Sequence, residues 1–100
     1  MSSSPQPGVH IATIAHGGMI WDTYLDFEDH LHPGAGYRAR LRFEPPPGTE
    51  GQDATATTVI IIEDSYEEAV AKARSFDDRQ LQSLLRSTLP EPEWLGARPL

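Results

Sequence analysis

Cysteine is missing from this chain, and lysine occurs once, as Lys72. The first absence excludes a disulfide framework, thiol catalysis and zinc held by thiolates. Long apolar runs are missing too, since no stretch approaches the roughly 20 apolar residues that span a bilayer. The first residues, MSSSPQPG, lack the basic and apolar regions of a secretory signal. We therefore expect a soluble cytoplasmic protein without a membrane partner.

Positive charge is also scarce. Eight basic residues stand against 15 acidic ones, which gives a net charge of −7. Binding to nucleic acid normally requires a clustered positive surface that displaces counterions from the phosphates. The sequence therefore predicts partners other than nucleic acid.

The length and composition fit one globular domain. Of the 100 residues, 38% are hydrophobic and 23% charged, which is ordinary for a folded protein. A chain of this length is too short for two cores of normal size. Residues 1–8 hold no apolar group to bury apart from the first methionine, so we expect a disordered tail followed by a single domain over 9–100. Three successive prolines predict an exposed, Pro-rich loop at 44–54.

Two neighbouring segments, 21–32 and 37–43, alternate between apolar and charged residues. Successive side chains of a strand point to opposite sides, so each segment predicts a strand with one apolar and one charged face. The apolar positions are the expected core: Trp21, Leu25, Phe27, Leu41 and Phe43. The charged positions are expected to face one another in an antiparallel pair: Asp26 opposite Arg42, Glu28 opposite Arg40 and His30 opposite Arg38.

A third strand is expected before these two, from Val9. Gly17 and Gly18 can adopt the positive φ angles of a two-residue hairpin turn, which predicts that His16 and Met19 close the turn. The same pairing places Ile14 opposite Trp21 and Ile11 opposite Tyr24, with Val9 and Ile11 on the charged face. A fourth strand is predicted at 55–62, TATTVIII, from its β-branched residues.

Helix-capping patterns follow the predicted fourth strand. Ser65 followed by Glu68 resembles a capping box and predicts a helix over 66–74; Ser75 followed by Asp78 predicts another over 77–88, or a kink in one longer helix. The fold class expected is therefore α+β: a four-stranded, mainly antiparallel sheet, made of a three-strand meander plus a fourth strand, with one or two C-terminal helices packed on one face.

The arginines of the charged face are the first candidate site. Arg38, Arg40 and Arg42 alternate along one strand, so their guanidinium groups share a side and can hold an anion by bidentate hydrogen bonds. The alternative is that Asp26 and Glu28 neutralise them across the hairpin, each exposed pair contributing about 0.2–1 kcal/mol.

A metal site is the second candidate. His30 and His32 project to the same side of a strand and, with Asp26 or Glu28, offer ligands suited to zinc, iron or manganese. The arginines on the facing strand oppose cation binding at this place.

No nucleophile, base and oxyanion site can be assembled from this sequence. We therefore expect a small binding or protein-interaction module without catalytic activity or cofactor. A sheet covered by helices on one face leaves its other face and its edges for a partner, which favours a homodimer or a complex with another protein. The alternative is a metal-binding protein or metal-dependent enzyme that uses His30 and His32 with a nearby carboxylate.

Overall fold

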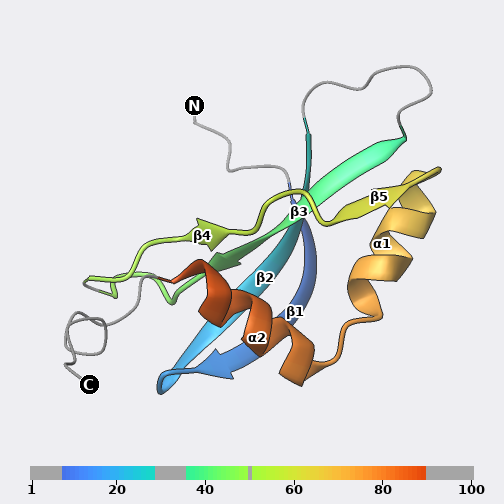
Figure 1. The fold of residues 1–100 in the computed structure, drawn as a ribbon. Helices are drawn as coiled ribbons and strands as arrows, with labels where there is room; N and C mark the ends of the chain where they lie inside the picture. Colours follow the sequence, from blue (N-terminus) through green and yellow to red (C-terminus); the bar gives the residue numbers. More distant parts are fainter. Residues whose placement is uncertain (1–7, 29–35, 50, 90–100) are drawn as a thin grey trace, which may run out of the picture.

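A computed structural model of the protein describes residues 8–28, 36–49 and 51–89. The chain forms one antiparallel sheet, and both helices lie on the same face of it (Figure 1). The elements, in chain order, are β1 (Val9–His16), β2 (Met19–Phe27), β3 (Tyr37–Glu44), β4 (Thr55–Ala56), β5 (Ile61–Glu63), α1 (Tyr66–Arg74) and α2 (Asp78–Thr88). The α+β class and the three-strand meander are confirmed. The predicted tail, apart from Gly8, and the predicted strand beyond Glu28 lie outside the described residues.

The core lies between the sheet and the two helices. Its strand residues are at most 2% exposed: Ile14, Trp21, Leu25, Ala39, Leu41, Phe43 and Ile61. The helices contribute Ala69 and Ala73 from α1 and Leu81 and Leu85 from α2. Phe27, also predicted for the core, is only half-buried and stacks on the Tyr66 ring with the centroids 5.3 Å apart. The alternation of the sequence therefore assigned the buried face of β2 and β3 correctly, and Phe27 lies where that face ends.

A bulge interrupts the first hairpin. Gly17 and Gly18 have φ of 62° and 79°, and His16 pairs with Met19 as predicted. The register then shifts between His10 and Ala12, so Tyr24 pairs with His10, and the predicted pairing with Ile11 is wrong. One extra residue in a strand moves all that precedes it to the opposite face.

The bulge corrects the assignment of two apolar residues. Val9 pairs with Leu25 on the buried face, and both Val9 and Ile11 pack against the core. The sequence predicted both residues on the charged face, and this prediction is wrong. His10 takes that place instead.

The hairpin of β2 and β3 differs in register from the prediction by two residues. Asp26 pairs with Arg40 in place of Arg42, and the Glu28 amide donates to the Arg38 carbonyl at 2.9 Å. An even shift keeps every side chain on its predicted face, because the side-chain period of a strand is two. The hydrophobic pattern therefore fixed the faces, whereas the exact register depends on the connection between the strands.

The predicted fourth strand is split into β4 and β5. Ala56 pairs with Arg42 and Ile61 with Ala39, so five steps along this segment span three along β3. Thr57 bridges the irregularity: its amide donates to the Leu41 carbonyl at 2.9 Å, and its hydroxyl accepts from the Leu41 amide at 3.1 Å. The threonine side chain thus satisfies a backbone donor of β3 where the regular pairing is interrupted.

The described residues form two helices, and the caps of these helices differ in part from the prediction. Ser65 caps α1 by accepting from the Glu68 amide, as expected. The N-cap of α2 is Asp77, with Gln80 completing the capping box, and Ser75 is the C-cap of α1. Ser75 has helical backbone angles, φ −81° and ψ −13°, whereas an N-cap needs the extended conformation that Asp77 adopts.

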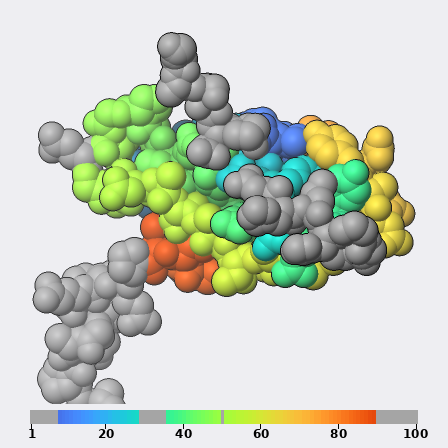
Figure 2. Space-filling model, turned by 90° about the horizontal axis from the view of Figure 1, so that it is seen from above, coloured from blue at the N-terminus to red at the C-terminus, as the bar shows by residue number. Residues whose placement is uncertain are grey.

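The two ends of the molecule are built differently. In the space-filling view, α1 lies at one end and the Pro-rich connection between β3 and β4 lies at the other (Figure 2). Within the part of the chain that the structure describes, no helix is long and apolar enough to cross a membrane.

Candidate functional site

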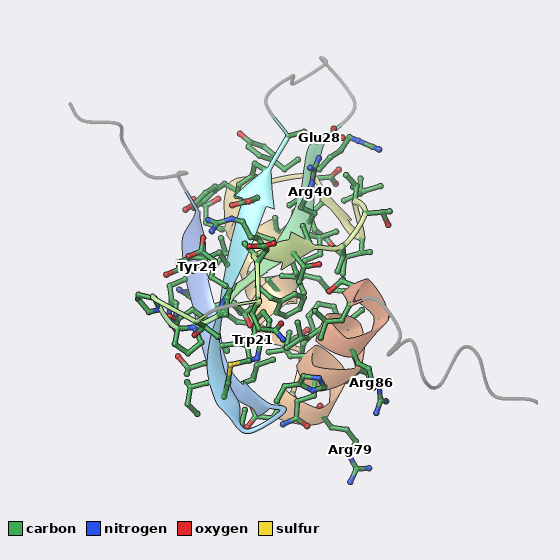
Figure 3. The ribbon with its side chains drawn as sticks, turned by 90° about the vertical axis from the view of Figure 1, so that its left-hand side faces the viewer. Trp21, Tyr24, Glu28, Arg40, Arg79 and Arg86 are labelled. Carbon is green, nitrogen blue, oxygen red and sulfur yellow. The ribbon has the colours of Figure 1, made fainter. Side chains whose placement is uncertain are left out.

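The face of the sheet opposite the helices, called the outer face here, carries the predicted arginines. It is formed by the even-numbered residues of β2 and β3 and by Glu28, which follows β2: Ile20, Asp22, Tyr24, Asp26, Glu28, Arg38, Arg40, Arg42 and Glu44. Two further arginines, Arg79 and Arg86, project from α2 on the helix side, away from Arg40 (Figure 3). The outer face is therefore the place where cations and acids of different strands meet.

Arg42 is held on several sides by its neighbours. Its Nε donates to Asp26 Oδ2 at 2.7 Å and its Nη2 to Oδ1 at 3.3 Å, and its Nη1 contacts the Glu44 carboxylate. Its guanidinium carbon also lies 4.6 Å from the centre of the Tyr24 ring. The Arg42 side chain is only 12% exposed, so this guanidinium is engaged within the fold.

Arg38 is paired as well, but more openly. Its Nε donates to Glu28 Oε1 at 2.9 Å, and both side chains remain about a third exposed. The residue expected opposite Arg38 was His30, which lies outside the described residues. Neutralisation of the arginine row by acids across the hairpin, the alternative to anion binding, is thus present for two of the three arginines.

Arg40 differs from its two neighbours. It pairs with Asp26 in the strand register, but that carboxylate is already held by Arg42. Among residues 8–28, 36–49 and 51–89, none forms an ion pair with Arg40. Figure 3 shows Arg40 near the Glu28 end of the sheet, where β3 runs beside β5.

A second polar cluster was not predicted. His10 Nε2 lies 3.1 Å from Asp22 Oδ1, and the Thr13 hydroxyl donates to the same oxygen at 3.1 Å. The His10 ring also meets Tyr24 edge to face, with the centroids 5.3 Å apart. The cluster exists because the bulge brings His10 to this face. No pattern in the sequence predicted the bulge.

Two of the four predicted metal ligands, Asp26 and Glu28, lie within the described residues. The carboxylates of Asp26 and Glu28 are engaged by arginines, and His30 and His32 lie outside the described residues. Within the ranges that are described, no group of three or more histidine or acidic side chains converges as a metal site would require. The site built on His30 and His32 therefore stays a prediction.

Exposed apolar side chains mark the edge of the sheet at β5. Ile60 and Ile62, called the isoleucine edge here, are 38% and 54% exposed and flank the buried Ile61. Ile62 pairs with Arg38 in register, which places it on the outer face, and the alternation of exposure places Ile60 there too. At the opposite end of the sheet, Ile20 is 55% exposed beside the first hairpin turn.

The two edges of the sheet differ in how far side chains cover their backbone. At β1, Arg74 Nη2 donates to the His10 carbonyl at 3.3 Å and Gln82 Nε2 to the Ala15 carbonyl at 2.9 Å, so helix side chains cover the strand edge. At β5, no side chain within the described parts of the chain bonds to the backbone of Ile62. Open apolar edges favour pairing with a further strand.

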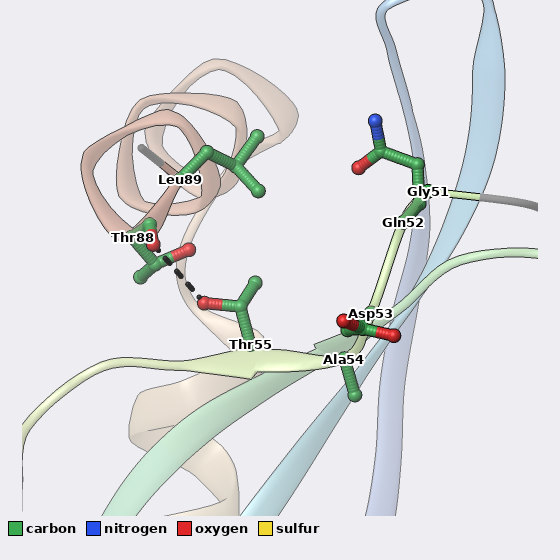
Figure 4. Close-up of a pocket in the computed structure, with 7 residues that line it drawn as sticks. All are labelled: Gly51, Gln52, Asp53, Ala54, Thr55, Thr88 and Leu89. Carbon is green, nitrogen blue, oxygen red and sulfur yellow. Dashed lines mark hydrogen bonds between the residues drawn. The ribbon is translucent and has the colours of Figure 1, made fainter. Parts of the chain in front are cut away.

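One open hollow lies apart from the outer face. It has a volume of about 390 Å³ between segment 51–55 and the end of α2, where the Thr55 hydroxyl donates to the Thr88 carbonyl at 3.3 Å (Figure 4). Among its described lining residues Asp53 is the only titratable one, so the lining offers no acid and base pair. None of the predicted site residues lies there.

Comparison with known proteins gives no match. No family model fits the sequence, and neither a curated protein nor a solved structure is similar to this chain. Function therefore has to be argued from the surface itself.

Proposed function

We propose that this protein is a small, non-catalytic interaction module that associates with a second copy of itself through the open edge of β5. The observation that carries the proposal is the isoleucine edge. Ile62 lies on β5 and Ile60 directly precedes it; both are large, exposed apolar side chains, and the backbone of Ile62 has no described side-chain partner. Burying an isoleucine side chain completely contributes roughly 1.5–3 kcal/mol, which favours contact with another protein surface.

The contrast between the two edges supports the choice of β5. β1 combines a bulge with two side-chain donors from the helices, which are features that discourage strand addition. The segment from Thr57 to Ile62 carries no charge and no proline, and all six of its residues are β-branched. Such a segment pairs readily with a strand of another chain.

The arrangement of the polar groups supports binding in preference to catalysis. On the outer face, Asp26 and Glu28 are held by arginines of the sheet itself. The hollow beside α2 lies at a different place, and Asp53 is the one titratable group among its described lining residues. Acid–base and nucleophilic sites commonly combine a reactive group with a second group that orients or activates it, within hydrogen-bond reach of a bound substrate.

Light scattering coupled to size-exclusion chromatography tests the proposal. The wild-type protein is expected to shift from monomer to dimer as its concentration rises, and Ile62→Ser is expected to move this shift to higher concentration. Ile20→Ser is the matched control, because Ile20 is equally exposed but lies at the far end of the sheet. A strict monomer at millimolar concentration, or an equal effect of both substitutions, contradicts the proposal.

A further inference from the structure

We infer the register of this association: two copies of β5 pair antiparallel about a two-fold axis at Ile62, and Arg40 of each copy meets Asp64 of the other. The inference rests on the proposed self-association and adds its geometry. Three properties of β5 and its neighbours support this register: the direction of the backbone groups, the alternation of side chains and the charges.

The backbone selects Ile62 as the centre. The Arg38 carbonyl accepts from the Glu28 amide, so the backbone groups of Arg38 face β2. Ile62, its partner in register, therefore forms no hydrogen-bonded pair with β3, and its own amide and carbonyl point away from the sheet. Two such residues related by a two-fold axis can exchange both hydrogen bonds, which is the antiparallel closed pair.

The alternation of side chains then fixes the contacts on the outer face. With Ile62 opposite Ile62 of the second copy, Ile61 lies opposite Glu63 within β5, and the residues that flank the strand, Ile60 and Asp64, come opposite each other. The two Ile62 side chains cover each other on the outer face. Neither acid faces an acid of the other copy, so the register avoids the like-charge pairs that destabilise a sheet.

Charge complementarity assigns a partner to Arg40. Arg40 lies beside the segment 57–60, since Leu41 accepts from Thr57 and Ala39 accepts from Ile60. Asp64 of the second copy lies one strand further out, about two strand spacings or roughly 10 Å from Arg40 along the outer face. An extended arginine and an aspartate together span this distance over Ile60. Asp64 is exposed and, like Arg40, forms no ion pair with another described residue.

Cysteine cross-linking tests the register, and a chain without natural cysteine makes it clean. In a closed antiparallel pair the two Cα atoms lie about 5.5 Å apart, within the range that a disulfide spans. Under mild oxidation, Ile62→Cys is expected to give a covalent dimer in most of the protein, and the equally exposed Ile20→Cys little or none.

A charge exchange tests the Arg40 contact separately. Arg40→Glu and Asp64→Arg are each expected to raise the dimer dissociation constant about tenfold or more, because each replaces an attraction between opposite charges by a repulsion. The double variant is expected to restore the dissociation constant to within about threefold, since it exchanges the two charges and keeps the pair. Circular dichroism of each single variant checks that it is folded.

The outcomes separate the inference from the proposed function. If the wild-type protein dimerises but Ile62→Cys does not cross-link, or the double variant is no better than the single ones, the register is wrong and self-association stands. If the wild-type protein is monomeric, both fail.

Discussion

Thr23 is the only polar residue in the core of the described chain. It is completely buried on β2 between Ala12 and Phe43, and its hydroxyl has no hydrogen-bond partner among the residues that the structure describes. Leaving a hydroxyl buried and unsatisfied costs about 1–3 kcal/mol. Most side chains of this sheet follow the rule that apolar residues point inward, and Thr23 is the exception that lowers stability.

Thr23→Val is therefore expected to raise the free energy of unfolding by about 1 kcal/mol, because the methyl group fills the same space without the desolvation cost. Urea unfolding followed by the fluorescence of the buried Trp21 measures it. Thr13→Val is the control: its exposed hydroxyl donates to Asp22, and its removal is expected to give no gain. An unchanged or lower stability of Thr23→Val would mean that the hydroxyl has found a partner.

The two ion pairs of the outer face are predicted to differ in strength. Asp26→Asn is expected to lower the free energy of unfolding by about 1–2 kcal/mol, because the less exposed Arg42 loses a charge-assisted bidentate partner. Glu28→Gln removes the more open pair with Arg38, and about 0.2–1 kcal/mol is expected. Urea unfolding of both variants in one buffer gives the comparison. A larger loss for Glu28→Gln contradicts this order.

At the scale of elements, short local signals placed the helices well and the sheet less well. The Ser65 cap could be read from sequence because a cap involves residues only three positions apart. The boundary between the helices needed a choice between Ser75 and Asp77, and the backbone angles decided it. The bulge at Ile11 and the irregularity at Thr57 each depend on a neighbouring strand, so no local pattern predicts them.

The cap of α2 provides a test at this scale. Asp77→Ala is expected to lower the free energy of unfolding by about 1 kcal/mol, since the Gln80 amide loses its acceptor and the capping box opens. Asp78→Ala is the matched control, because it removes the same charge from the first turn and leaves the cap in place. Urea unfolding and the helical signal in circular dichroism measure both. Equal losses would show that the charge near the helix end matters and the cap does not.

At the scale of the whole molecule, the net charge of −7 opposes the proposed dimer. The repulsion between two such chains acts over long distances, whereas contacts at the isoleucine edge act at close range. The Debye length falls from about 30 Å at 0.01 M salt to about 8 Å at 0.15 M, so salt screens the repulsion first.

The dimer is therefore expected to tighten when salt is raised from 0.01 to 0.15 M. Sedimentation equilibrium at both concentrations measures the dissociation constant, and Ile62→Ser provides the comparison for a weakened edge. Weaker association at 0.15 M would show that ion pairs, and not the apolar contacts, dominate the interface.

The sequence by itself determined which side of β2 and β3 is buried and where the helices lie, because both follow from periods of two and of 3.6 residues within one segment. The tertiary structure decided the strand register, the bulge and the division of β4 from β5, since these depend on hydrogen bonds between segments far apart in the chain. For the same reason only the structure shows that Glu28 pairs with Arg38 and that no described acid pairs with Arg40. The exposure of Ile60 and Ile62 is also visible only in the structure. A run of isoleucines is typical of a buried strand, and whether it is buried depends on the elements that pack beside it.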